Sequence, residues 1–264
     1  MIKFFRKIRQ NMLNEGKTSK YFKYAIGEII LVVIGILLAL QINNWNEERK
    51  NRIEETALLE QLHSEFKSNL AQLDGKIIIR NSMIDASLKL LNYVDNPLER
   101  NKDSILKHLS FTRLSPTFDP IVNDISSSGR IQLLSNNKLK ELLSIWTSEI
   151  IQVTEEEVSW RIYNENHYRP FILEFWSLRN AFNQFWKNNT MEDFHLEKGT
   201  VVAFDLKNSK RNTDILKLFD QPKFEDHLAS CAAYSKLINS QSLSLRKRIV
   251  EILNMIENQL KENK

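Results

Sequence analysis

The chain has 264 residues, and 37 Lys and Arg side chains against 33 Asp and Glu give it a formal net charge of +4. Hydrophobic residues make up 42% and charged residues 27%, a composition typical of a chain that folds, so disorder throughout is excluded. Only 6 Gly and 5 Pro argue against sandwiches and barrels with many tight turns and favour long helices. A single Cys excludes an intramolecular disulfide framework and a zinc ribbon.

The net positive charge of the first 23 residues is larger than that of the whole chain. They contain one acid, Glu15, and the basic residues Lys3, Arg6, Lys7, Arg9, Lys17, Lys20 and Lys23. The rest of the chain is therefore slightly acidic, and no basic stripe for nucleic acid is indicated on it. As a helix this tail is basic and amphipathic, which suits an anionic membrane surface. A loose positive anchor without a helix is the alternative.

A long apolar segment follows at residues 24–44. As an α-helix it matches the ~30 Å hydrocarbon core of a bilayer, with lysines on one side and Trp45 on the other. We predict a single-pass helix of the inner (cytoplasmic) membrane, with residues 1–23 in the cytoplasm because Lys and Arg are retained there, and residues 45–264 in the periplasm. A cleaved signal peptide is one alternative, although Ala39-Leu40-Gln41 lacks the second small residue of a cleavage site. A buried helix of a soluble protein is the other.

Three residues of this segment predict contacts between membrane helices. Glu28 is an ionisable group about one turn inside the span, where such groups are costly. At 100° per residue it shares a face with Gly35 and Ala39, a small-xxx-small pair that lets helices approach closely. We therefore expect self-association or a partner helix along this stripe. The alternative is that Glu28 only reaches back to the cytoplasmic interface.

The N-terminal residues carry a resemblance to a known family. They are Ile2-Lys-Phe-Phe-Arg-Lys-Ile-Arg-Gln10 and Tyr24-Ala-Ile-Gly-Glu-Ile-Ile-Leu-Val-Val-Ile-Gly-Ile-Leu-Leu-Ala-Leu-Gln-Ile-Asn-Asn-Trp-Asn-Glu47, with a weaker likeness at residues 124–139. These segments resemble an uncharacterised family of Bacteroidota membrane-anchored proteins, a domain of unknown function. The resemblance implies one N-terminal span and a helical extracytoplasmic part. It brings no known activity and no catalytic residue.

Beyond the span, the chain predicts an all-α fold, in which the membrane helix continues as a stalk into an antiparallel helical bundle. No Pro occurs between residues 43 and 96, and apolar residues recur there at an average spacing typical of a straight packed helix. These residues are Leu59, Leu62, Phe66, Leu70, Leu73 and Ile77. The stripe predicts that this helix lines the core of the bundle.

Proline signals predict the next helix starts. Asn96-Pro97 resembles an N-cap followed by N1 and predicts a helix to about Leu109. Asp119-Pro120 repeats the signal for a short helix that Gly129 ends.

A second group of helices is predicted after residue 135. The first covers residues 136–168 and the next starts at Pro170. The stripe of the latter is Phe171, Phe175, Leu178, Phe182 and Phe185. Residues 193–208 lose the helical period and predict a small irregular or hairpin insertion. A short helix follows Thr213, and Pro222 starts a long closing helix. Its apolar positions are Phe224, Leu228, Cys231, Ile238, Leu245, Ile249, Ile252 and Ile256.

Chemical motifs are scarce, so neither an enzyme nor a bound cofactor or metal is expected. No GxSxG, HExxH, P-loop or GxGxxG occurs. Asp193, His195 and Glu197 would place three metal-ligand types on one face of a strand, but the same alternation is typical of any half-buried strand. Glu165 and His167 are also potential metal ligands, but no geometric argument supports a site there.

Three further features have a binding interpretation and a structural one. Ser126–Arg130 has the residues of an anion cradle, although a helix stop is favoured. Trp176 and Trp186 suit lipid headgroups or a ligand pocket, although core packing is favoured. Cys231 lies on an apolar face and is expected to be buried.

The function that the sequence favours is a membrane-tethered periplasmic interaction or scaffold module, with the lipid bilayer as one partner and no nucleic acid. A ligand-sensing bundle that signals through a membrane partner is the alternative. An enzyme with dispersed catalytic residues is a third class.

Overall fold

The computed structural model describes residues 18–122, 129–187, 204–211 and 213–263. These residues are all-α and form no strand, as the sequence predicts. The chain divides into two compact units, Met1–Ala57 and Leu58–Lys264. Helix α2 (Thr18–Asp95) contains both the predicted span and the predicted first bundle helix without a break. It supplies the described part of the first unit and one long helix of the second.

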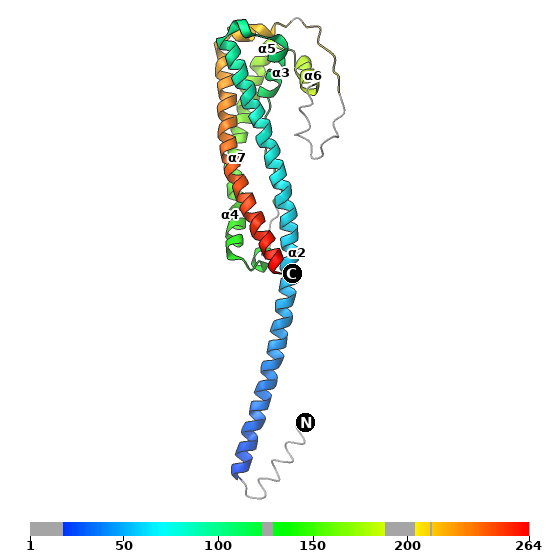
Figure 1. The fold of residues 1–264 in the computed structure, drawn as a ribbon, viewed down its shortest axis with the longest axis vertical. Coiled ribbons are helices and arrows are strands. Elements are labelled where there is room, and N and C mark those ends of the chain that lie inside the picture. The colour runs from blue at the N-terminus through cyan, green and yellow to red at the C-terminus, as the bar shows by residue number, and fades with distance from the viewer. Residues whose placement is uncertain (1–17, 123–128, 188–203, 212, 264) are drawn as a thin grey trace. The chain divides into compact units, whose positions relative to one another are not determined.

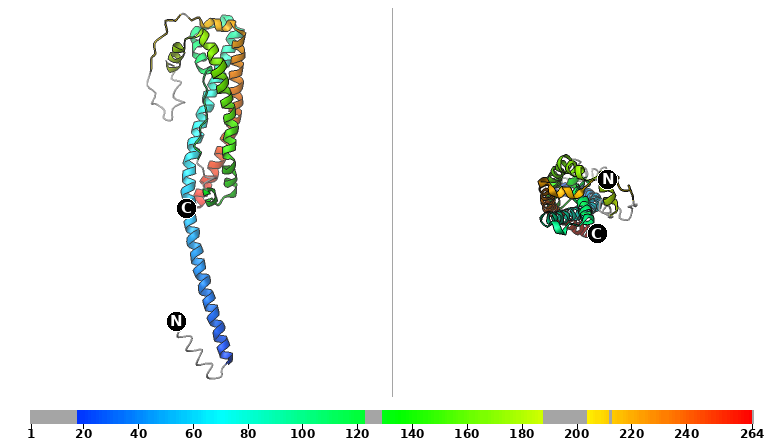
Figure 2. Two further views of the ribbon diagram at one scale, coloured as in Figure 1. Left: turned by 180° about the vertical axis from the view of Figure 1, so that it is seen from behind. Right: turned by 90° about the horizontal axis from the view of Figure 1, so that it is seen from above.

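The second unit is built around three long helices. They are residues 58–95 of α2, α4 (Asn137–Tyr163) and α7 (Pro222–Glu262), which lie side by side in Figures 1 and 2. The direction of α7 follows from its pairs with α2: His63 with Glu257 at 2.9 Å and Asp74 with Arg246 at 2.7 Å. The two pairs are the same number of residues apart on both helices but in opposite directions. Helix α7 therefore runs antiparallel to this part of α2, as the predicted bundle requires.

The apolar stripes predicted for α2 and α7 are confirmed as core. In α7 every predicted apolar position is buried: Phe224, Leu228, Cys231, Ile238, Leu245, Ile249, Ile252 and Ile256. In α2, Leu59, Leu62, Phe66 and Leu73 are buried, while Leu70 and Ile77 are partly buried against the same core. The 3.6-residue period identifies these positions because every third or fourth side chain of a straight helix returns to one face.

The helix predicted from Pro97 to about Leu109 is present, but its α-helical part begins later than predicted. Pro97–Glu99 form only a 3₁₀ turn, and α3 runs from Lys102 to Thr112. The N-cap is Asn101, whose side chain accepts a hydrogen bond from the N–H of Ser104 at 2.9 Å. The extended backbone of Arg100 separates the turn from the helix, and its Nε donates to the Tyr93 carbonyl at 2.8 Å.

The helix predicted from Pro120 is wrong over its described residues. Residues 114–122 form neither helix nor strand, and residues 123–128 lie outside the described residues. Gly129 has a φ of 72° and precedes a 3₁₀ turn, Arg130–Leu133. Such a φ is accessible to Gly without strain.

The helix predicted at residues 136–168 is confirmed with one modification. Asn136 caps α4 by accepting from the Leu139 N–H at 3.0 Å. After Tyr163 the chain makes one π-helical turn, Asn164–Tyr168, and continues as α5 (Arg169–Phe175). Pro170 has no N–H and clashes with the carbonyl four residues earlier in a regular helix, so the wider turn accommodates it.

The single aromatic helix predicted after Pro170 is two helices. Trp176 has extended backbone, and α6 begins after it and covers Leu178–Lys187. Phe171 and Phe175 therefore lie on a different helix from Phe182.

The region after α6 tests two further predictions. In the predicted insertion, residues 193–203 lie outside the described residues and residues 204–208 are irregular. The short helix predicted after Thr213 is a 3₁₀ helix, Ile215–Asp220.

Candidate functional site

The most exposed apolar surface belongs to α2. Large aliphatic side chains are exposed on every side of the helix: Ile26, Ile29, Ile30, Leu31, Val32, Val33, Ile34, Ile36, Leu37, Leu38, Leu40 and Ile42. Covering one such side chain stabilises a protein by about 1.5–3 kcal/mol, so a dozen left in water would be very costly. Among the described residues, α2 is the one helix long and apolar enough to cross a membrane.

The three residues of the predicted association stripe all lie in α2. Glu28 is half-buried, whereas Gly35 and Ala39 are exposed. A Cβ added at Gly35 would meet nothing within 4 Å, so its surface is open to a neighbour. Association along this stripe stays a prediction.

Only part of the predicted basic tail is described. Lys20 and Lys23 belong to α2, and the side chain of Lys23 is exposed. The other basic residues of the tail lie outside the described residues: Lys3, Arg6, Lys7, Arg9 and Lys17.

A buried polar layer divides the core of the bundle. Arg80 of α2 and Glu157 of α4 form an ion pair between their Nη2 and Oε1 atoms, and each residue is at most 2% exposed. Arg80 Nη1 also donates to Ser242 Oγ at 3.0 Å and to Asn239 Oδ1 at 3.3 Å, both on α7. Apolar clusters lie on both sides of this layer along the bundle. One residue set therefore ties together all three long helices.

Burial perturbs the charged groups of this layer. It raises the pKa of the Glu157 carboxyl, while Arg80 acts in the opposite direction. It lowers the pKa of the Arg80 guanidinium and of the Lys76 amine, and Glu157 opposes both shifts. Removing ions from water is costly even when they are paired, so the layer adds less to stability than the attraction between its charges alone would.

Two amide side chains of α2 bind the backbone of a non-helical segment at Asp119 and Ile121. Gln72 accepts from the Asp119 N–H at 2.8 Å and donates to its carbonyl at 2.9 Å. Asn69 does the same for Ile121, at 2.8 and 3.0 Å. Glu157 accepts from the Phe118 N–H at 2.7 Å. The side chains thus replace the partners that a neighbouring strand would offer, which explains why no helix starts at Pro120.

An aromatic cluster surrounds His227 on α7. Its Nδ1 lies 2.9 Å from the Tyr163 hydroxyl, and its ring centroid is 5.1 Å from that of Tyr168 and 4.8 Å from that of Phe171. Burial lowers the pKa of His227, so its neutral form is favoured. The cluster is a packing element with one titratable group inside it.

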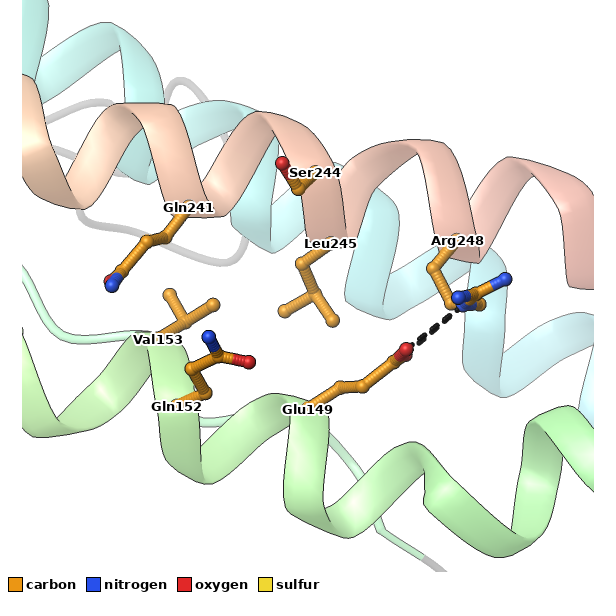
Figure 3. Close-up of a pocket in the computed structure, with 7 residues that line it drawn as sticks. All are labelled: Glu149, Gln152, Val153, Gln241, Ser244, Leu245 and Arg248. Atoms are coloured by element: carbon orange, nitrogen blue, oxygen red, sulfur yellow. Dashed lines mark hydrogen bonds and ion pairs between the residues drawn. The ribbon is translucent and has the colours of Figure 1, made fainter.

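A groove lies between α4 and α7. It encloses about 190 Å³ (Figure 3). Its lining residues are Glu149, Gln152, Val153, Gln241, Ser244, Leu245 and Arg248. An ion pair crosses one end, where Arg248 Nε lies 3.0 Å from Glu149 Oε1. The groove offers amides, a hydroxyl and charges above two apolar side chains.

The predicted metal set is not tested by the structure. Asp193, His195 and Glu197 lie outside the described residues. Within the described ranges, no three His, Cys, Asp or Glu side chains are placed to hold a metal ion. Glu165 and His167 are exposed on the π-helical turn.

The other predicted features are structural where they are described. Cys231 is fully buried, its thiol donates to the Thr112 carbonyl at 3.3 Å, and burial raises its pKa to about 12. Trp176 is 2% exposed and belongs to the core, whereas Trp186 is half-buried with its ring centroid 5.8 Å from that of Phe204. Of the predicted anion cradle, Arg130 donates to Gln61 at 3.2 Å, and residues 126–128 lie outside the described residues.

The sequence analysis did not predict the polar layer, the hydrogen bonds of Gln72 and Asn69 to the backbone of Asp119 and Ile121, or the groove. Each joins residues that are far apart in the chain, such as Arg80 and Glu157. The only local signals were charged or amide residues at positions that fall on apolar helix faces, as Glu157 does between Val153 and Trp160.

Comparison with known proteins gives one match. The family DUF6090, which is described as a family of unknown function, matches residues 28–111, about a third of the chain. The matched part begins within the apolar segment of α2 and ends within α3. None of the curated proteins and none of the solved structures gives a significant match. Similarity to an uncharacterised family is thus confirmed, while a Bacteroidota source and a membrane anchor stay predictions.

Proposed function

We propose that this chain is a single-pass protein of the inner membrane, with residues 1–23 in the cytoplasm and a helical domain displayed in the periplasm as an interaction or scaffold module. The observation that carries the proposal is the exposed aliphatic surface around α2 from Ile26 to Ile42. A helix that is apolar all round suits the interior of a bilayer. The lysines before it support the orientation, and Trp45 after it suits a membrane interface.

A reporter fusion tests the topology. A reporter enzyme that is active only outside the cytoplasm, fused after Lys264, should give activity, and the same reporter fused before Met1 should give none. Replacing the basic residues of the tail with Ser should lower the activity of the C-terminal fusion, because orientation depends on them. Activity from the N-terminal fusion alone would reverse the proposal.

The mass of the mature chain separates an anchor from a cleaved signal peptide. The anchor keeps residues 1–44, so intact-mass measurement of the membrane-extracted protein should give the full chain. Loss of residues up to about Gln41 would establish cleavage and overturn the anchor.

The scaffold role is supported by the three long helices of residues 58–264, which share two buried apolar clusters. Proteins that co-purify from native membranes should be compared between the full chain and a chain with residues 58–264 replaced by an unrelated domain. At least one partner should depend on residues 58–264. Identical partner sets would contradict an interaction role for this unit.

Association of the span with another membrane helix is a separate part of the proposal. Glu28, Gly35 and Ala39 share a face of α2, and close approach there needs the small side chain at Gly35. Gly35→Leu should reduce crosslinking between helices in native membranes, with Gly27→Leu as the matched control. Unchanged crosslinking in Gly35→Leu would remove association along this stripe.

A second candidate function, a ligand-sensing bundle that acts through a membrane partner, is favoured by the groove between α4 and α7. The groove lies between these two helices, and the polar-layer residue Ser242 directly follows Gln241 of the groove.

A further inference from the structure

Helix α2 continues without a break past the apolar segment, and the side chains of residues 43–54 are all exposed. Most of them are charged or amide groups. The apolar exceptions are Trp45, at the end of the predicted span, and Ile53, which is 60% exposed. Most helix stability in proteins comes from packing against a neighbour, so a second helix beside this segment would stabilise it.

One side of this segment has the spacing of a coiled-coil seam. Steps of three and four residues alternate through Asn43, Asn46, Lys50 and Ile53, which we call the stalk seam. Such positions, a and d of a heptad, meet the same positions of a partner helix. The stalk seam includes the one aliphatic side chain of residues 43–54, and four residues before Asn43 it continues into Ala39 of the predicted association stripe.

The residues that flank the stalk seam have complementary charges. Arg49 takes heptad position g and Glu54 takes position e, five residues later. In a parallel, in-register pair of helices, position g of one chain lies beside the following position e of the other. Arg49 of each copy therefore faces Glu54 of the other, and the two-fold symmetry of a homodimer forms this pair twice. Residues 43–54 carry three acidic and three basic side chains in total, so two copies do not repel each other through net charge.

The polar members of the stalk seam favour two strands in one register. An Asn side chain both donates and accepts, so Asn43 and Asn46 can each bond to the same residue of a second copy. Asn43 Nδ2 donates to Glu47 Oε1 at 3.2 Å, which uses only one of its two N–H groups. A polar residue at position a costs some stability but specifies the register and the number of strands.

We propose that residues 43–54 of α2 bind the same residues of a second copy of this chain as a short parallel coiled coil, with the stalk seam at its centre. The inference rests on the proposed membrane anchor, because two copies inserted in the same direction have parallel α2 helices. It identifies the partner helix as a second copy and extends the contact beyond the span. A short polar seam is weak by itself, but association of the spans raises the effective concentration of the two segments.

Cysteine crosslinking of the full chain in native membranes tests the proposal. Asn46→Cys and Ile53→Cys place a thiol in the stalk seam, and Glu48→Cys is the matched control because it lies about 140–160° around the helix from both. Mild oxidation should give at least about five times more disulfide-linked dimer from either seam variant than from the control, because a disulfide needs Cα atoms within about 7 Å. Cys231 is fully buried, so the unchanged chain should give no dimer.

Charge variants test the register. In the Ile53→Cys chain, Arg49→Glu places two acids opposite each other and should lower the yield of dimer about threefold, and adding Glu54→Arg should restore it. Arg52→Glu makes the same change of charge at heptad position c, away from the stalk seam, and should leave the yield unchanged.

Alkaline extraction of the same membranes separates this inference from the anchor. The inference alone is overturned if the chain resists extraction but the seam variants give no more dimer than Glu48→Cys, or if the crosslinked product contains a different protein. It is also overturned if Arg52→Glu lowers the yield as much as Arg49→Glu does. Release of the unchanged chain by alkali would overturn the anchor, and the parallel coiled coil with it.

Discussion

Glu157 is the residue on which the buried polar layer most depends, because it pairs with Arg80 and also accepts from the Phe118 N–H. Glu157→Gln keeps an acceptor for Phe118 but leaves the Arg80 guanidinium buried without a counter-charge. Breaking a buried ion pair in this way costs about 3–5 kcal/mol, so urea unfolding of the full chain in detergent should show a loss of that size.

The double variant Arg80→Met/Glu157→Gln is the control for this loss. It removes the uncompensated charge, so most of the lost stability should return. Equal destabilisation in the single and double variants would mean that packing, and not the charge, accounts for the effect.

Two histidines make the stability of the bundle depend on pH. Burial lowers the pKa of His108 and of His227 below the ordinary value of 6.5. Between 6.5 and the lowered values the unfolded chain binds protons that the folded chain does not, so their contribution is complete above 6.5 and is lost as pH falls through the folded pKa values. The melting temperature should therefore decrease on acidification from neutral pH. The double variant His108→Gln/His227→Gln should flatten this dependence, and an unchanged slope would refute the assignment.

At the scale of elements, the non-helical segment at residues 119–121 depends on two side chains of α2. Asn69→Ala with Gln72→Ala removes four hydrogen bonds to its backbone. Water replaces some of them, because the Asp119 pairs are exposed, so we expect a loss of about 1–3 kcal/mol. Hydrogen exchange of the Asp119 and Ile121 amides should accelerate strongly. Ser68→Ala, at an exposed position on the same helix, should leave both exchange rates unchanged.

At the scale of the whole molecule, the apolar segment should decide where the chain resides. Each charged residue near the centre of a membrane helix costs about 2.5–3.5 kcal/mol, so Val33→Lys with Leu37→Lys should greatly reduce the fraction that resists alkaline extraction from membranes. Leu237→Lys with Leu243→Lys places the same charges at exposed positions of α7 and should leave that fraction unchanged. Equal extraction of both double variants would argue against a membrane-spanning role of α2.

The helices could be predicted because their signals are local. The stripe from Leu59 to Ile77 and the apolar positions of α7 repeat with the helical period, and the Asn136 cap acts within one turn. Local signals failed where distant residues competed. Pro120 follows Asp119, a residue type that favours N-caps, yet Gln72 and Asn69 bind the backbone on both sides of Pro120 and no helix starts there.

The candidate sites also divide into those that local patterns predict and those that depend on how helices pack. The exposed segment of α2 and the face that joins Glu28 to Ala39 follow from composition and helical geometry, without reference to any other element. The pairing of Arg80 with Glu157 and the groove between α4 and α7 depend on the alignment of separate helices, which no local pattern encodes. The sequence by itself therefore determined the helical class, the long apolar segment and the buried face of each main helix, because these depend on contacts a few residues apart. Only the tertiary structure decided which polar groups meet inside the bundle, because that depends on how its helices pack.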